Sequence, residues 1–116
     1  MAKEACIFCR IAKKEIPAKI VFEDNKILAF EDLRPQAPVH CLIIPKEHIA
    51  KVSDLGEEKA QIIGDLIITA RDIAKEKGVE GSGYRIVINC NRDAGQDVFH
   101  LHLHLLGGRR FSWPPG

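Results

Sequence analysis

The chain has 116 residues, of which 46% are hydrophobic and 28% charged, and its formal net charge is +1. This length suits one soluble globular domain with a working core. The near-neutral charge gives no electrostatic reason to expect nucleic-acid or membrane binding.

The first predicted element is a short helix over about residues 6–14, with Ile7, Phe8 and Ile11 on one side. Pro17 ends it. Two strands follow, 19–23 and 27–32, and the polar turn at Asp24-Asn25 predicts that they form a hairpin. A third strand is expected over residues 40–44.

A long amphipathic helix comes next, because apolar residues recur every three or four positions from Leu55 to Ala74. Asp54 is the expected N-cap, with Glu57 three residues later, and Gly78 is the expected C′ residue. Two further strands are predicted over 84–89 and 99–106. Strands, then a helix, then more strands predict an α+β domain whose five strands form an antiparallel sheet beside one long and one short helix.

No apolar run approaches the length of a membrane helix, and the N-terminus lacks the pattern of a secretory signal. A cytoplasmic location is therefore expected, in which the four cysteines are thiols or metal ligands rather than two disulfides. The spacing Cys6-x-x-Cys9 supplies half of a zinc site. Two buried, small apolar residues are the competing interpretation. Cys41 and Cys90 have no matching partners and are expected in the core or in strands.

Three of the five histidines, His100, His102 and His104, alternate with leucines in the run HLHLHL. In a strand this pattern places the imidazoles on one face and the leucines on the other. The row could be the polar face of an ordinary strand, a catalytic metal site or a nucleophilic centre. The outer Cα atoms of a straight strand lie about 13 Å apart, which is poor geometry for three ligands of one ion. Nucleophilic catalysis uses the spacing best.

The loop NCNRDAGQD precedes the histidine row. Gly95 permits a sharp turn whose backbone N–H groups could hold phosphate oxygens, and Asn89 and Gln96 add amide donors. The same residue types fill ordinary turns, so the loop alone is a weak signal.

The segments GQDVFHLHLH and FEDLRPQAPVHCLIIPKEH together resemble the histidine triad (HIT) nucleotide-binding proteins, whose pattern is His-φ-His-φ-His-φ-φ with φ apolar. The resemblance runs from IPAKIVFED to the terminal GGRRFSWPPG. The PQAP, GGR and WPPG stretches are similar to the Hint-like branch, whose members hydrolyse nucleoside phosphoramidates. The resemblance implies one HIT domain over residues 1–116, with the short helix and the cysteine pair in 1–18 and a C-terminal tail at 107–116.

The implied activity is cleavage of purine nucleoside 5′-phosphoramidates. By the resemblance, His102 attacks the α-phosphorus to form a covalent nucleotidyl-histidine, and water then releases the nucleoside monophosphate. His104 lies near the leaving group. A dinucleoside polyphosphate hydrolase, and a nucleotide-binding or scaffold protein with vestigial catalysis, stay open as alternatives.

The implied catalytic set is His102, His104, His100 and His40. The implied nucleotide-binding set is Asp32 at the ribose, Leu33 at the base, Asn89, Gln96, Asp97, Val98, His102 and His104 at the phosphate, and Trp113 in the tail. For His40 the competing interpretation is an ordinary polar residue at a strand start, and for Asp32 a turn-initiating carboxylate.

Asp97 departs from the family pattern, because the Hint-like branch commonly has a hydroxyl residue directly after Gly-Gln. An ionised carboxylate cannot donate a hydrogen bond, and it repels phosphate. We therefore expect Asp97→Ser to raise the turnover of phosphoramidates.

Relatives that carry the cysteine pair bind a structural zinc, and the matching ligands here are Cys6, Cys9, His48 and His100. His100 would then orient the strand and take no part in acid–base chemistry; without zinc it would support His102. The chemistry itself needs no cofactor. The resemblance also implies a homodimer, joined through residues 84–89 and the long helix, in which the tail with Trp113 lies near the partner's site.

Overall fold

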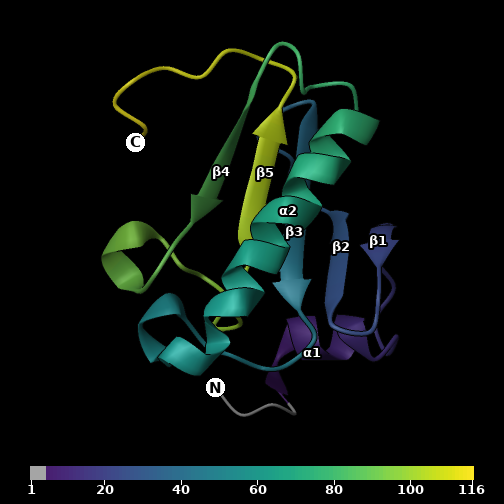
Figure 1. The fold of residues 1–116 in the computed structure, drawn as a ribbon, viewed down its shortest axis with the longest axis vertical. Coiled ribbons are helices and arrows are strands. Elements are labelled where there is room, and N and C mark those ends of the chain that lie inside the picture. The colour runs from purple at the N-terminus through teal and green to yellow at the C-terminus, as the bar shows by residue number, and fades with distance from the viewer. Residues whose placement is uncertain (1–4) are drawn as a thin grey trace.

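Five strands form one antiparallel sheet in the order β1-β2-β3-β5-β4 in the computed structural model, which describes residues 5–116 (Figure 1). The strands are β1 (Ile20–Glu23), β2 (Ile27–Glu31), β3 (Val39–Pro45), β4 (Tyr84–Ile88) and β5 (Leu103–Gly107). The helices are α1 (Ile7–Ala12) and α2 (Ala60–Glu76). The predicted α+β fold, with five antiparallel strands and one long and one short helix, is confirmed.

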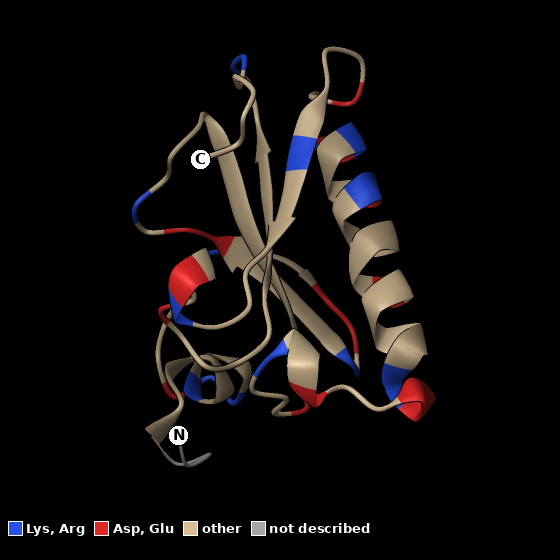
Figure 2. Cartoon of the chain, turned by 90° about the vertical axis from the view of Figure 1, so that its left-hand side faces the viewer, with Lys and Arg blue, Asp and Glu red and all other residues tan. Residues whose placement is uncertain are grey.

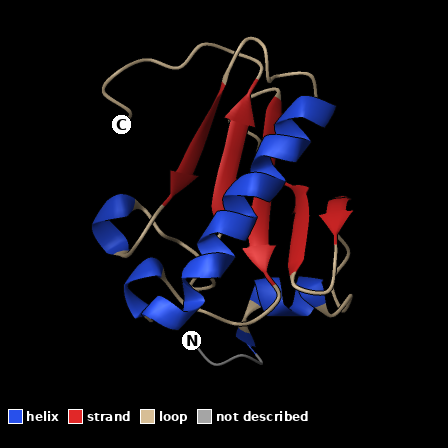
Figure 3. Cartoon of the chain, viewed as in Figure 1, coloured by secondary structure: helices blue, strands red, loops and turns tan. Residues whose placement is uncertain are grey.

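α2 runs diagonally across one face of the sheet (Figure 3), and α1 packs against β2 and β3 on the other face. Ala29, Ile43 and Leu105 belong to the core on the α2 side, with Leu66 of the helix. Leu28, Phe30 and Leu42 belong to a second core with α1. Because β2 and β3 are buried on both faces, their sequences are nearly unbroken apolar runs rather than alternating patterns.

Acidic and basic residues are interspersed along α2 and in the loops at both ends of the sheet (Figure 2). Within residues 5–116, no helix is both long enough and apolar enough to cross a membrane.

The start of α2 differs from the prediction. Asp54 closes a short 3₁₀ turn (Val52–Asp54), a second turn (Glu57–Lys59) follows, and the helix begins only at Ala60. Gly56, with extended backbone between the two turns, prevents a continuous helix. The prediction of Asp54 as N-cap is therefore wrong. Gly78 follows the C-cap with a φ of 78° and is the C′ residue, as expected.

The alternation of histidine and leucine is confirmed, but the strand is shorter than predicted. Leu101, Leu103 and Leu105 are fully buried in the α2 core. The predicted strand 99–106 begins only at Leu103. Before that point the chain leaves the sheet, and the Leu101 N–H donates to the Ile49 carbonyl at 2.7 Å.

Candidate functional site

Two imidazoles meet on the α1 side of the sheet. His104 on β5 lies opposite Leu42 of β3, and His40 of β3 lies opposite Leu106 of β5. Since residues two apart on a strand share a face, both imidazoles point the same way. His40 Nε2 and His104 Nδ1 lie 2.9 Å apart.

The hydrogen-bond partners fix which nitrogen of each ring carries the proton. The Gln36 backbone N–H donates to His40 Nδ1 at 3.0 Å. That nitrogen must be an acceptor, so in the neutral ring the proton is on His40 Nε2. His40 Nε2–H then donates to His104 Nδ1, which leaves the proton of His104 on Nε2.

His102 holds the opposite tautomer. Its Nδ1 lies 2.8 Å from the backbone carbonyl of His100, and a carbonyl can only accept. Nδ1 therefore carries the proton, and Nε2 keeps its lone pair. The ring is 4% exposed and meets the ring of Phe8 edge-on, with centroids 5.2 Å apart. The site thus pairs an unprotonated nitrogen on His102 with an N–H donor on His104, and the centroids of these two rings are 5.0 Å apart.

A cavity of about 230 Å³ opens beside these rings. One part of its wall is apolar; that part is lined by Ile7, Phe8, Ile11, Ile16, Ala18, Phe30, Leu33, Leu42 and Val98. The other part is polar, and is lined by Glu31, Asp32, Asp97, His102 and His104. Among the described residues that line it, three are carboxylates and none is Lys or Arg.

Asp32 and Leu33 stand at the mouth of the cavity. One Asp32 oxygen accepts from the Arg34 N–H at 2.8 Å, while the other lies 3.5 Å from His40 Nε2. The carboxylate therefore both initiates the turn and faces the site, so its two interpretations are compatible. Leu33 is 96% exposed, unlike an ordinary structural leucine.

The loop before the histidine row is held from inside by Gln96. Its side-chain oxygen accepts from the Asn91 N–H at 2.9 Å, and its Nε2 donates to the carbonyls of Ala50 and Val98. Both ends of this buried amide are used within the protein, which differs from the predicted role as a phosphate donor. Asn89 lies half-buried just after β4.

Burial keeps His104 and His40 neutral. Burial first, and then the neighbouring His102 and His40, lower the pKa of His104 to about 4, against the opposing effects of Asp32 and Asp97. Burial also lowers the pKa of His40, and Asp32 opposes it. As neutral rings, these two histidines retain the tautomers described above near neutral pH.

The second constellation joins Cys6, Cys9, His48 and His100 into what we call the cysteine–histidine cluster. The potential ligand atoms all lie within 4.8 Å of one another. His100 Nδ1 is 3.3 Å from Cys6 Sγ and 3.4 Å from Cys9 Sγ, and His48 Nδ1 is 3.2 Å from Cys9 Sγ. In a tetrahedral zinc site the sulfur–nitrogen separation is roughly 3.6 Å, from bonds of about 2.3 and 2.05 Å. The cluster is close to this geometry.

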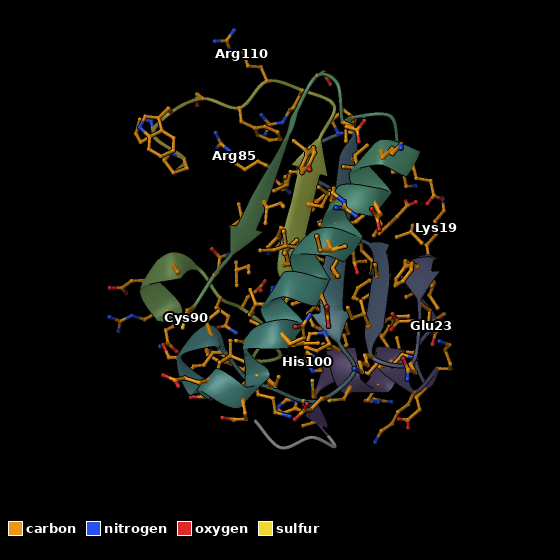
Figure 4. The ribbon with its side chains drawn as sticks, viewed as in Figure 1. Lys19, Glu23, Arg85, Cys90, His100 and Arg110 are labelled. Carbon is orange, nitrogen blue, oxygen red and sulfur yellow. The ribbon has the colours of Figure 1, made fainter. Side chains whose placement is uncertain are left out.

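His100 also has the environment of a zinc-binding histidine. Its Nε2 donates to the Pro45 carbonyl at 2.7 Å, which leaves Nδ1 as the free lone pair directed at the two sulfurs. Such a donor bond from the second ring nitrogen is the usual support for a metal ligand. His100 is fully buried beside α1 and the lower end of the sheet, where Figure 4 labels it. The donor set and the support both fit a structural zinc.

Asp32, His40 and His104 also bring ligand atoms together. The hydrogen bonds of these three residues, however, do not fit a metal site. The Gln36 N–H occupies His40 Nδ1, so His40 Nε2 carries the proton and cannot bind a metal as a neutral ring. This group is better described as a hydrogen-bonded pair of imidazoles beside a carboxylate.

The C-terminal tail lies apart from the cavity within one chain. Phe111 is held between Arg109 and Arg85, whose guanidinium carbons lie 4.2 and 5.1 Å from the ring centroid. Arg85, labelled in Figure 4, also donates to the Ser112 carbonyl at 3.0 Å. Trp113 is 83% exposed. The predicted contribution of Trp113 therefore depends on a second chain.

The sequence-based list omitted the apolar wall of the cavity. Ile7, Phe8 and Ile11 come from α1, and Ile16 comes from the segment after it. A signal was present in the sequence, because Ile7, Phe8 and Ile11 give the short helix an apolar side. The Gln36 N–H was also missed, and nothing in the sequence marks a backbone donor.

The HIT domain family matches residues 13–111 of the chain. An uncharacterized HIT-like protein of Synechocystis sp. is 50% identical over 113 residues, which cover 97% of this chain and 98% of that protein. The crystal structure of a HIT family hydrolase from Legionella pneumophila Philadelphia 1 is 53% identical, with a TM-score of 0.94, over 96% of this chain and 99% of that one. A histidine triad protein from Clostridium difficile is 43% identical, with a TM-score of 0.93 and 97% of each chain covered.

Proposed function

The chain belongs to the HIT domain family, and from this premise we propose that it is a nucleotide-binding hydrolase that cleaves purine nucleoside 5′-phosphoramidates. The Legionella relative is described as a hydrolase. The observation that carries the finer proposal is the pair of opposite tautomers, a bare Nε2 on His102 and an Nε2–H on His104, at the polar wall of one cavity.

His102 is the nucleophile in this proposal. Its Nε2 lone pair attacks the α-phosphorus, and the bond from phosphorus to the amine breaks. The departing amine nitrogen needs a proton, which the protonated form of the His40–His104 pair delivers from His104 Nε2, so that the pair returns to its neutral form. Water then attacks the same phosphorus, the bond from phosphorus to His102 Nε2 breaks, and the proton that the water loses returns to the His40–His104 pair. The nucleoside monophosphate leaves, and His102 is free again.

The rest of the cavity accommodates the nucleoside. The apolar wall, including Phe8 and Phe30, offers flat contacts for a base, and the exposed Leu33 lies at its rim. Asp32 is proposed to accept hydrogen bonds from the ribose hydroxyls. The backbone at Asp97 and Val98, with Asn89, is proposed to contact the phosphate, as the family resemblance implies.

The carboxylates of the cavity favour phosphoramidates over dinucleoside polyphosphates. A phosphoramidate brings one phosphate, whereas a polyphosphate brings several negative charges. Glu31 is paired with Lys19 and Lys77, but the described lining holds Asp32 and Asp97 without a Lys or Arg to offset them. Extra phosphates would therefore meet repulsion with no compensating ion pair.

The proposed structural zinc is held by Cys6, Cys9, His48 and His100, and it would supply rigidity rather than chemistry. We also propose that the active form is a homodimer, joined through β4, which is an edge strand of the single-chain sheet, and through α2. Ile67 and Ile68 of α2 are exposed in one chain, 41% and 46% respectively, which supports this.

The proposal is tested by comparing initial rates on adenosine 5′-phosphoramidate and on diadenosine tetraphosphate, with wild-type and His102→Ala proteins. We expect the phosphoramidate to be the better substrate and His102→Ala to abolish its turnover while AMP binding and the circular dichroism spectrum persist. Faster cleavage of the tetraphosphate would make polyphosphates the substrate class. AMP binding without turnover by the wild type would favour the scaffold alternative.

A further inference from the structure

We propose that the cysteine–histidine cluster positions both the nucleophile and the apolar wall of the cavity, so that zinc in the cluster and nucleotide in the cavity strengthen each other's binding. His100 is then a positioning residue that acts through His102. The inference rests on the proposed function, to which it adds a coupling between two sites. Two independent connections between the cluster and the cavity support it.

The first connection runs along the backbone. The ring of His100 is held on one side by Cys6 and Cys9, with Sγ to Nδ1 distances of 3.3 and 3.4 Å, and on the other by the Pro45 carbonyl at 2.7 Å. The carbonyl of the same residue accepts from His102 Nδ1 at 2.8 Å. Fixing the His100 side chain therefore fixes the acceptor that sets the tautomer and direction of His102.

The second connection runs through α1. Cys6 is the N-cap of this helix, where its Sγ accepts from the Cys9 N–H at 3.3 Å. Between the two cysteines lie Ile7 and Phe8, which line the cavity, and Ile11 follows one turn later. The Phe8 ring meets His100 edge-on at 6.0 Å and His102 at 5.2 Å between centroids. The same turn of helix thus faces both sites.

α1 depends on such contacts for its position. It has only six residues, and an isolated helix shorter than roughly 12 residues is marginal in water. No acidic residue lies in its first turn to stabilise the helix dipole. Cys6 and Cys9 tie its beginning to His48 and His100, which come from distant parts of the chain. Loss of these contacts leaves apolar packing, and the ion pair of Lys14 with Glu23 just beyond the helix, to hold the wall.

Coupling between two binding sites is reciprocal. If the cluster orders α1 and His102 for the nucleotide, then bound nucleotide must raise the affinity of the cluster for zinc by the same factor. A cluster that merely stabilised the fold from a distance would not respond to nucleotide.

The experiment loads the full-length protein with one zinc ion and measures the equilibrium distribution of zinc between the protein and a competing colorimetric chelator, with and without saturating AMP. AMP binding is measured separately by calorimetry. We expect AMP to raise the affinity for zinc about fivefold or more. Phe8→Leu keeps an apolar side chain in the wall but removes the ring contacts with His100 and His102, so we expect a smaller effect of AMP in this variant. Cys90→Ser is the matched thiol control, because Cys90 contacts Ser53 outside the cluster, and it should behave as the wild type.

Backbone amide exchange gives a readout that does not need nucleotide. The Arg10 and Lys13 amides bond to the carbonyls of Cys6 and Cys9, both at 3.1 Å, and should exchange faster once zinc is removed, whereas β3 amides should change little. AMP binding that leaves the affinity for zinc unchanged would overturn the coupling alone. Absence of AMP binding would instead contradict the proposed function. The amide-exchange measurement would then still test whether the cluster positions α1. Failure to take up zinc, or unchanged α1 exchange after its removal, would overturn the proposal.

Discussion

His40 and His104 lie on adjacent strands and share one proton-bearing contact, with His40 Nε2 donating to His104 Nδ1 over 2.9 Å. The Gln36 N–H behind His40 gives this contact its direction. The result is a fixed N–H on the far nitrogen of His104, where the proposed leaving amine needs a proton. His40 therefore acts on the reaction through His104.

Removing the His104 N–H should reduce the turnover of substrates whose amine is a poor leaving group. His104→Ala should lower kcat for adenosine 5′-phosphoramidate about 10²-fold, the low end for a general acid. His40→Phe keeps a ring of similar size but cannot donate, so His104 can adopt either tautomer, and we expect a loss of about tenfold. Both losses should shrink when the leaving amine is a weak base. Equal losses for strong and weak amines would mean that neither histidine serves the leaving group.

Asp97 should limit the rate on phosphoramidates whose leaving amine is uncharged. It lines the cavity with His104 and places a negative charge where the substrate carries its phosphate. Asp97→Ser removes that charge and adds a hydroxyl donor, so kcat/KM should rise severalfold. The kcat/KM values of the wild type and of Asp97→Ser are compared at low and at high salt. Because salt screens the Asp97 charge, the difference between the two proteins should be smaller at high salt. An unchanged or lower rate would show that the carboxylate faces away or has a positive role of its own.

Stability should fall as the pH drops from about 6.5 toward 4. The pKa of His104 is lowered from 6.5 to about 4 in the folded chain, so between these values the unfolded chain binds more protons and protonation favours unfolding. One such group contributes a slope of at most about 1.4 kcal/mol per pH unit. Urea denaturation of wild-type and His104→Gln proteins from pH 7 to pH 4 measures this slope. Identical slopes in the two proteins would contradict the expected contribution of His104.

Zinc binding should be stoichiometric and should need the cysteine pair. We expect one zinc per chain by elemental analysis. Cys9→Ser should lose the metal and lower Tm by several degrees, because it removes one of four ligands from a buried site. Cys90→Ser should keep both the metal and the Tm. Zinc retained by Cys9→Ser would exclude the cluster as the site.

We expect Trp113 to contribute to substrate binding only in the homodimer. Sedimentation should give about twice the 13.0 kDa chain mass. Ile68→Glu places a charge in the exposed apolar part of α2 and should yield monomers. Trp113→Ala should raise KM in the dimer and have no effect in the monomeric variant. A wild-type protein that is monomeric and fully active would contradict the proposed homodimer.

Much of this site could be predicted because it follows local rules. The alternation in residues 100–105 needs only the two-residue period of a strand, and it placed the leucines in one core and the histidines on the opposite face. The C′ position of Gly78 likewise follows from a local conformational preference.

The errors lie where tertiary contacts override local pattern. Asp54 has the right spacing for a cap, but Gly56 divides that region into two 3₁₀ turns. Gln96 is a polar residue in a phosphate-type loop, yet the fold uses its amide internally. The tautomers depend on the Gln36 N–H and the His100 carbonyl, which are backbone groups that no residue identity reveals.

The most direct test of the central claim is to trap the covalent intermediate. Adenosine 5′-phosphoramidate labelled at the α-phosphorus is mixed with excess enzyme, and the reaction is quenched in base within milliseconds. The protein is then digested, and the labelled peptide is identified by mass spectrometry. We predict that label and an adenylyl mass increment appear on the peptide containing His102 in the wild type and are absent from His102→Ala. Rapid turnover with no label on that peptide would contradict His102 as the nucleophile.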